Sequence, residues 1–308
     1  MKIVQTGKNK NFSVPCIAVG CMRIADMVEK QLKSHISECL DSGLNFFDHA
    51  DIYGGGLCEI NFGKAVKEMG LNREELIIQS KCGIVPGKMY DFSKEYIIGA
   101  VDGILKRLQT DYLDILLLHR PDALCEPEEV ASAFDELYNA GKVRHFGVSN
   151  HSPMQIELLK RYVNQEIIIN QLQMSITSSN LIAAGLEVNM TTEGAVNRDG
   201  YVLDYCRLND ITVQAWSPFQ FGFFEGSFIG RKDKFPELNA VLDELAEKYN
   251  ITPTGIASAW LFRHPAGIQM IAGTTKISRL KEIIAGSEIS LTREEWYRLY
   301  LSAGHILP

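Results

Sequence analysis

Eight short apolar runs rich in β-branched residues recur along the chain, and longer stretches with helical spacing of apolar residues separate them. The runs begin at Ile17, Asn45, Leu76, Tyr112, Val143, Ile167, Ile211 and Ile268. A strand followed by a helix and a return to the next strand is the repeating unit of an α/β fold with a parallel sheet. Eight such units in 308 residues favour one closed (β/α)₈ TIM barrel over an open sheet.

Further elements are expected at both ends of the barrel. Residues 2–15 predict an N-terminal β-hairpin, and extra C-terminal helices follow the last strand, one of them over residues 291–303 with Thr292 as its N-cap. Between the strands, the apolar spacing predicts helices at Lys30–Asp41, Lys94–Leu108 and Glu128–Asn139. No Gly/Ser-rich or Pro-rich linker divides the chain, so we expect residues 1–308 to form a single domain.

The composition excludes several classes of protein. With 31 basic and 38 acidic side chains, the net charge of −7 leaves no surplus of cations for a nucleic-acid backbone. No apolar run approaches the roughly 18 residues of a membrane span, and the N-terminus lacks the apolar core of a signal peptide. Seven cysteines without a C-x-x-C pair indicate reduced thiols. We therefore expect a cytoplasmic monomer or weak homo-oligomer that binds neither nucleic acid nor membranes.

Polar side chains gather at the C-terminal ends of three neighbouring runs, where TIM barrels place their functional groups. Asp48 and Tyr53 follow the second run, Lys81 the third and His119 the fourth. A desolvated lysine beside a tyrosine favours the phenolate and lowers a pKa that is ordinarily about 10, while a carboxylate holds the lysine in place. An imidazole can hold a carbonyl oxygen within reach of the phenol. The set predicts carbonyl reduction.

A metal site is an alternative interpretation of the same region, with His49, Asp51 and His119 as ligands. No H-x-H pair and no carboxylate at ligand spacing on a later strand accompany them. Metal hydrolysis is therefore the weaker interpretation, and we expect no metal.

A phosphate site is expected at the end of the eighth run, where Gly273-Thr274-Thr275-Lys276 precede a helix. Glycine allows close approach, the N–H groups of a helix start point at an anion, and hydroxyls add donors. No G-x-G-x-x-G follows a strand, so a Rossmann site is not expected. The cations Lys276, Arg279 and Lys281 could equally form a solvated helix face.

Two motifs resemble the signatures of the aldo-keto reductases. They are Asp48-x-Ala50-x-x-Tyr53-Gly54 with Glu59-x-x-x-Gly63, and Gly141-Lys142-Val143-Arg144 with Gly147-Val148-Ser149-Asn150. Lys81 and His119 lie between them in the matching order, and the resemblance extends over nearly the whole chain. It implies that Tyr53 is the general acid, Lys81 its pKa-lowering partner, Asp48 the counter-ion of the lysine, and His119 the residue that orients the carbonyl.

The resemblance also implies a cofactor, NADPH rather than NADH, and a small carbonyl substrate. At the nicotinamide end, Ser149, Asn150 and Gln171 would hold the carboxamide and Trp216 would stack on the ring. Ser217 and Phe219 would line the pyrophosphate channel. At the adenosine end, Lys276 and Arg279 would pair with the 2′-phosphate. The implied cofactor set is completed by Gly273, Thr274, Thr275 and Glu282.

Two functions remain open, and so does the substrate. The chain is either an NADPH-dependent reductase of aldehydes or ketones, or an NADP-binding, redox-sensing regulatory subunit with little catalysis; a barrel without a long N-terminal extension favours the enzyme. Arg120 beside His119 and His145 could steer an acidic substrate, or Arg120 could form a salt bridge at the rim. Segments 174–199 and 220–235 are where substrate choice would vary. In the second and directly before it, five aromatic residues could wall a pocket or cover the barrel: Phe219, Phe221, Phe223, Phe224 and Phe228.

Overall fold

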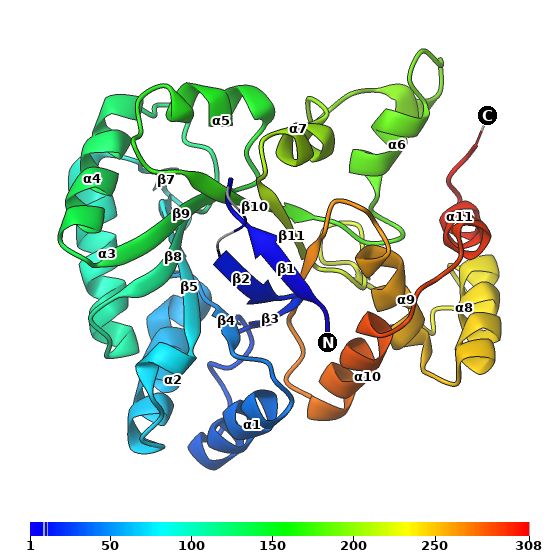
Figure 1. Ribbon diagram of the computed structural model, residues 1–308, viewed down its shortest axis with the longest axis horizontal. Helices are drawn as coiled ribbons and strands as arrows, with labels where there is room; N and C mark the ends of the chain where they lie inside the picture. Colours follow the sequence, from blue (N-terminus) through cyan, green and yellow to red (C-terminus); the bar gives the residue numbers. More distant parts are fainter. Residues whose placement is uncertain (9, 11, 308) are drawn as a thin grey trace.

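Eight parallel strands close into a barrel (Figure 1) in the computed structural model, which describes residues 1–8, 10 and 12–307. In their order around the barrel the strands are β3 (Ile17–Gly20), β4 (Phe46–Asp48), β5 (Ile77–Cys82), β8 (Leu113–Leu118), β9 (Val143–Ser149), β10 (Ile167–Gln173), β11 (Thr212–Trp216) and β14 (Gln269–Ala272). Each strand begins at the first or second residue of a predicted run, so the predicted (β/α)₈ fold is confirmed. Residues 9 and 11 of the predicted hairpin, and residue 308 of the predicted domain, lie outside the described residues.

Helices surround the barrel and connect its strands (Figure 1). They are α1 (Glu29–Asp41), α2 (Leu57–Glu68), α3 (Lys94–Leu108), α4 (Pro127–Asn139), α5 (Pro153–Lys160), α6 (Asn180–Leu186), α7 (Val202–Leu208), α8 (Pro236–Tyr249), α9 (Pro253–Phe262), α10 (Ile277–Ser287) and α11 (Arg293–Ser302). The three helices predicted between strands are α1, α3 and α4, and α11 is the predicted C-terminal helix. At its start Thr292 and Glu295 form a reciprocal capping box. Among the described helices, none is both long and apolar enough to cross a membrane.

The predicted N-terminal hairpin pairs β1 (Ile3–Thr6) with β2 (Phe12–Pro15) and lies across the centre of the barrel in Figure 1. The Thr6 side chain anchors the hairpin to the barrel. Its hydroxyl donates to the backbone carbonyl of Ile168 (3.1 Å) and accepts a hydrogen bond from the hydroxyl of Thr212 (2.7 Å). Both partners are near the N-terminal ends of their strands. The hairpin therefore closes that end of the barrel and leaves the opposite end for a site.

Two short hairpins follow barrel strands at the opposite, C-terminal end, and the sequence patterns did not predict them. One pairs β6 (Ile84–Val85) with β7 (Met89–Tyr90), and the other pairs β12 (Gln220–Phe221) with β13 (Gly226–Ser227). Strands of two residues are too short to show an alternating pattern in sequence.

The apolar core lies between the barrel and its helices. On α3, for example, Ile97, Val101 and Ile104 are spaced by three and four residues and are all fully buried. Inside the barrel, near its C-terminal end, the core gives way to polar side chains, because Asp48 lies opposite Gln79 on β5 and Gln171 opposite Gln214 on β11.

Candidate active site

The four residues chosen for their chemistry meet at the ends of β4, β5 and β8. Lys81 is fully buried, and its Nζ donates to both carboxylate oxygens of Asp48 (2.7 and 2.9 Å) and to the backbone carbonyl of His49 (2.8 Å). It also contacts the Tyr53 hydroxyl at 3.2 Å. The ring of His119 lies edge-on to that of Tyr53, with centroids 6.0 Å apart. The structure thus brings together a phenol, an ammonium, a carboxylate and an imidazole.

A left-handed turn places Tyr53. The residue opens a 3₁₀ turn (Tyr53–Gly56) in which Gly54 and Gly56 have φ values of 57° and 92°, and α2 begins directly afterwards. Residues with a Cβ rarely adopt this conformation, so the glycines allow the chain to reverse beside the tyrosine.

Burial decides the protonation of the phenol. It raises the pKa of Tyr53 above its ordinary value, and Lys81 opposes this only in part. Lys81 acts to lower this pKa, as the sequence led us to expect, but the loss of hydration of the phenolate outweighs the attraction of the ammonium, so the net shift is upward. Burial also acts to lower the pKa of Lys81, but Asp48 and Tyr53 together raise it. At neutral pH the site holds a protonated phenol beside a charged ammonium.

His119 is neutral at neutral pH. Burial, together with the positive charges of Lys81 and Arg120, holds its pKa well below the ordinary value. Its Nδ1 is buried, and no described residue hydrogen bonds to it. A neutral imidazole carries one N–H, so His119 can donate a hydrogen bond to an oxygen but is a poor proton source.

A buried network of four glutamines lies against Asp48, and the sequence analysis had selected only Gln171 from it. Two of them donate to Asp48 Oδ1, Gln79 at 2.6 Å and Gln171 at 3.2 Å. Both also donate to Gln214 Oε1 (2.9 Å each), and Gln214 donates in turn to Gln269 (2.7 Å). This network fixes the orientation of the carboxylate from the side of the barrel interior.

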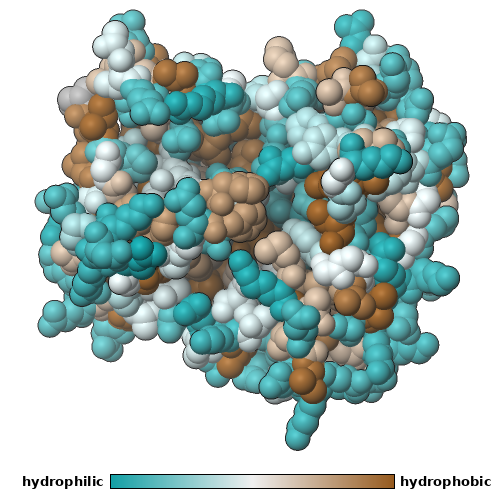
Figure 2. Space-filling view, turned by 180° about the vertical axis from the view of Figure 1, so that it is seen from behind, coloured by the Kyte–Doolittle hydropathy of each residue, from teal (hydrophilic) through white to brown (hydrophobic). Residues whose placement is uncertain are grey.

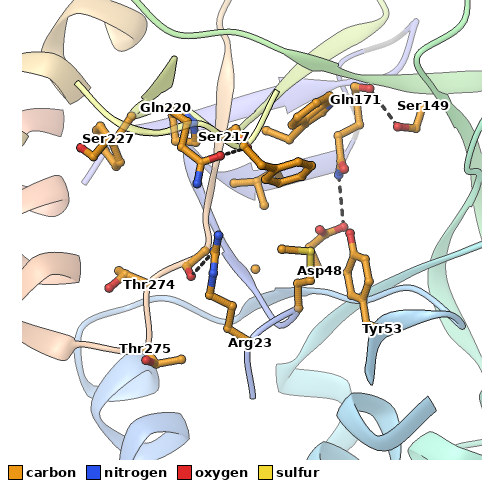
Figure 3. A pocket seen from close by; sticks show the side chains of 18 of the residues that line it. Arg23, Asp48, Tyr53, Ser149, Gln171, Ser217, Gln220, Ser227, Thr274 and Thr275 are labelled. Carbon is orange, nitrogen blue, oxygen red and sulfur yellow. Dashed lines mark hydrogen bonds between the residues drawn. The ribbon is translucent and has the colours of Figure 1, made fainter. Parts of the chain in front are cut away.

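A cavity of about 710 Å³ opens above these residues. Figure 2 shows the corresponding hollow near the centre of that face, with hydrophobic side chains at its rim. Asp48, Tyr53 and His119 line it, while Lys81 lies beneath. In Figure 3, Arg23 and Thr274 lie on one side of the cavity and Tyr53 lies on the other. The lining residues that the sequence analysis missed include Met22, Arg23, Ile52, Ile84, Gln220, Ser227 and Ile229.

Hydrogen bonds join the ends of β9, β10 and β11 into one wall of this cavity. The Ser149 hydroxyl donates to the backbone carbonyl of Gln171 (3.0 Å), and the Asn150 amide donates to the Ser149 hydroxyl (2.8 Å). The indole N–H of Trp216 donates to Asn150 Oδ1 (3.1 Å). These bonds hold the amide and the indole in position before any ligand arrives. All four residues line the cavity.

An adjoining wall is made by residues 273–276, which connect β14, the neighbour of β11, to α10. The Thr274 hydroxyl accepts the backbone N–H of Lys276 (3.2 Å), and the Arg23 guanidinium donates to the carbonyl of Gly273 (2.9 Å). Lys276 and Arg279 are exposed, line the cavity, and form no ion pair with any residue that the structure describes. Unpaired cations and free N–H groups at a helix start are suited to a phosphate-bearing cofactor.

Most of the remaining residues that were predicted to bind the cofactor line the cavity, but not all of them do. Ser217, Phe219, Gly273, Thr274 and Thr275 all line the cavity. Glu282, three residues beyond Arg279 on α10, is half-buried and does not line it, so nothing in the geometry supports a direct contact there. Lys281 does not line the cavity either. The interpretation as a solvated helix face therefore fits Lys281, but not Lys276 and Arg279.

The phenylalanines of the loop after β11 both wall the cavity and cover part of the barrel. Phe219, Phe223 and Phe224 line the cavity, whereas Phe221 and Phe228 are buried against the core. The ring of Phe224 stacks on Trp216, with centroids 5.9 Å apart and 23° between the planes. The loop thus covers part of the barrel and walls the cavity.

The residues of the alternative metal interpretation do not converge. The ring of His49 packs on Phe62, with centroids 4.6 Å apart, and burial together with Lys81 lowers its pKa to about 3. Neither His49 nor Asp51 lines the cavity. Within residues 1–8, 10 and 12–307, no group of three or more His, Cys, Asp or Glu side chains is placed to hold a metal ion.

Comparisons with known proteins agree with this geometry. Residues 16–300 match the model of the Aldo/keto reductase family. A 6-dehydroglucose reductase of Agrobacterium fabrum is 32% identical over 300 residues, which cover 93% of each protein. A solved aldo/keto reductase of Klebsiella pneumoniae, in complex with NADP and acetate, superposes with a TM-score of 0.77 at 26% identity, covering 100% of this chain and 96% of that one.

The relatives also include a protein that is named as a channel subunit. An Arabidopsis thaliana protein named as a probable voltage-gated potassium channel subunit beta is 27% identical over 277 residues, which cover 82% of this chain and 80% of that protein. Similarity to this group of proteins therefore does not by itself separate an enzyme from a regulatory subunit.

Proposed function

The chain belongs to the aldo/keto reductase family of oxidoreductases, and from this premise we propose that it reduces an aldehyde or ketone to an alcohol with NADPH, with Tyr53 as the general acid. The observation that carries the proposal is the contact of a buried, charged Lys81 with both Asp48 and the Tyr53 hydroxyl, at the floor of a cavity. NADPH, when bound, supplies the hydride that adds to the carbonyl carbon.

The side chains of the floor provide the proton and hold the reacting oxygen. Neutral His119 donates a hydrogen bond to the carbonyl oxygen, which gains negative charge as the C=O π bond breaks. Tyr53 then gives its hydroxyl proton to that oxygen, so that the alcohol forms and a phenolate remains. Lys81 lies 3.2 Å from the hydroxyl and stabilises this phenolate. Asp48, fixed by its glutamine partners, keeps the ammonium in place.

The two walls of the cavity suit the two ends of the cofactor. Lys276 and Arg279 would pair with the 2′-phosphate that distinguishes NADPH from NADH. Asn150 and Trp216, held by their mutual hydrogen bond, would contact the nicotinamide as its carboxamide partner and stacking surface. The Klebsiella pneumoniae neighbour in complex with NADP supports this cofactor.

The same residues support the enzymatic over the regulatory function. A regulatory subunit can carry the same residues, but turnover of a carbonyl substrate is the function that uses both the protonated phenol and the neutral imidazole at the cavity. One chain carries every residue of the site, so we expect a monomer to be active. All seven cysteines are free thiols, which suits the reducing cytoplasm.

The test is the variant Tyr53→Phe, which removes the proton donor and keeps the ring. We expect the rate of NADPH oxidation with 4-nitrobenzaldehyde to fall by roughly 10²- to 10⁴-fold, the range for loss of a general acid. The control is Tyr138→Phe, since Tyr138 is 54% exposed and lies outside the cavity. Equal rates for Tyr53→Phe and wild type would refute the catalytic assignment. NADPH binding without reduction of any aldehyde by the wild type would favour the regulatory subunit.

A further inference from the structure

Arg120 is a half-buried cation of the cavity with no partner. It follows His119 at the end of β8 and lines the cavity. No carboxylate or carbonyl among the described residues accepts a hydrogen bond from its guanidinium. The acid nearest in sequence, Asp122, is already engaged, because its two oxygens accept the backbone N–H groups of Phe92 (3.0 Å) and Leu124 (2.9 Å). The rim salt bridge considered for Arg120 is therefore not formed. His145 does not line the cavity, since its ring stacks on Phe12 of the N-terminal hairpin, with centroids 4.6 Å apart.

The position of Arg120 separates it from the phosphate end of the cavity. In the closed barrel, β8 is four strands from β14 in either direction, so the two lie on opposite sides. The loop after β14 provides the exposed cations Lys276 and Arg279. Arg23, which follows the neighbouring β3, is bonded to Gly273 on that same side. A cofactor whose phosphates lie there does not reach Arg120.

A cation that is partly desolvated and unpaired is costly unless a ligand pairs with it. Asp48 is the one acidic residue among those that line the cavity, and Lys81 already neutralises it. The walls nearby include the apolar side chains of Ile52 and Ile84. The free guanidinium therefore needs an anion that arrives with the substrate.

We propose that the physiological substrate is a carbonyl compound that carries an anionic group, a carboxylate or a phosphate, and that Arg120 binds this group while His119 binds the carbonyl oxygen. The inference rests on the proposed reductase function and specifies its substrate class. A planar guanidinium offers paired N–H groups that match two oxygens of either anion. Because Arg120 and His119 are adjacent in the chain, one short substrate can reach both.

A pair of aldehydes that differ in charge and by one methyl group tests the proposal. We expect the wild type to prefer 4-carboxybenzaldehyde to its neutral ester, methyl 4-formylbenzoate, in kcat/KM. In Arg120→Gln the ratio of the two kcat/KM values should fall by roughly 10- to 100-fold, as for loss of a hydrogen bond to a charged group. Arg161→Gln is the matched control, since Arg161 is an exposed arginine outside the cavity, and it should leave the ratio unchanged. A second pair, glyceraldehyde 3-phosphate and glyceraldehyde, distinguishes a phosphate from a carboxylate.

The ratio separates anion binding from a purely electrostatic effect of Arg120 on His119. An electrostatic effect would slow both aldehydes equally, and an unchanged ratio in Arg120→Gln would overturn the proposal. A binding measurement tests the anion site without turnover. With NADP⁺ saturating, benzoate should bind the wild type more tightly than benzamide does. Arg120→Gln should abolish this difference in affinity. If benzoate shows this preference and no aldehyde is reduced, the anion site stands and the reductase function alone fails. Equal binding of benzoate and benzamide to the wild type would overturn the anion site.

Discussion

Removing the charge of Lys81 should destabilise the protein even when the volume of the side chain is nearly kept. In Lys81→Met the volume is nearly kept, but Asp48 remains as a buried carboxylate without its cation. Breaking one half of a buried ion pair costs about 3–5 kcal/mol. Gln79 and Gln171 still donate to Asp48 Oδ1 (2.6 and 3.2 Å), so we expect the lower end, about 3 kcal/mol.

The double variant Asp48→Asn/Lys81→Met shows whether the cost comes from the unpaired charge. Asp48→Asn alone leaves a buried ammonium unpaired and should also cost about 3 kcal/mol, whereas the double variant contains neither charge. We expect the double variant to be no less stable than either single variant, which means a coupling energy of about 3 kcal/mol. With a urea m-value of about 3 kcal/mol/M for a chain of this size, each single variant should lower the unfolding midpoint by about 1 M. The reasoning is refuted if the losses of unfolding free energy in the two single variants add up in the double variant. It is also refuted if Lys81→Met lowers the urea midpoint by less than about 0.3 M.

Two further predictions concern pH and cofactor choice. Burial lowers the pKa of His49 to about 3 and those of His151 and His264 to about 4, and it holds the pKa of His119 well below its ordinary value. Burial also raises the pKa of Asp51 to about 7. Near the middle of the range from about pH 6 to 4.5, the unfolded chain binds a proton at each of these histidines that the folded chain does not bind, while folded Asp51 binds one proton that the unfolded chain lacks. The free energy of unfolding should therefore fall on acidification from pH 6 to 4.5 by at least about 1.4 kcal/mol per pH unit, and urea titrations in which it rises on acidification would contradict this balance. For the cofactor, the double variant of Lys276→Ala and Arg279→Ala should raise the Kd of NADPH at least about tenfold more than that of NADH, and an unchanged preference in a fluorescence titration would remove the 2′-phosphate site.

The barrel could be predicted from the sequence because its signals are local. Each strand shows as a short β-branched run, and caps such as Ser93 act within three residues, its side chain accepting the N–H of Tyr96. The hairpins at 84–90 and 220–227 have no such period, since two-residue strands cannot show one. Their placement depends on contacts between distant parts of the chain, which a single sequence does not display.

The chemical groups of the site could also be predicted, but their energetics could not. Gln79 and Lys81 are two residues apart on β5 and so point to the same face, a signal that could have identified Gln79 as a partner of the site. The net pKa of Tyr53 could not be predicted, because Lys81 lowers it while burial raises it more strongly, and burial depends on how fully the surrounding barrel excludes water. Lys81 and Asp48 are visible in the sequence, whereas the extent of burial is a property of the closed fold.

The distribution of charge connects the acidic composition to the cavity. The chain carries a net charge of −7, yet the residues that line the cavity include four cations, Arg23, Arg120, Lys276 and Arg279, and one acid. Low-dielectric walls strengthen and focus such a local field, so the cavity attracts anions although the molecule as a whole repels them. Three of the cations lie beside β14 or its neighbour β3 and would be neutralised by a dinucleotide phosphate. Arg120 lies on the far side of the barrel and would keep its charge after the cofactor binds, so the cofactor-bound cavity still favours an anionic substrate at the strand that ends in His119.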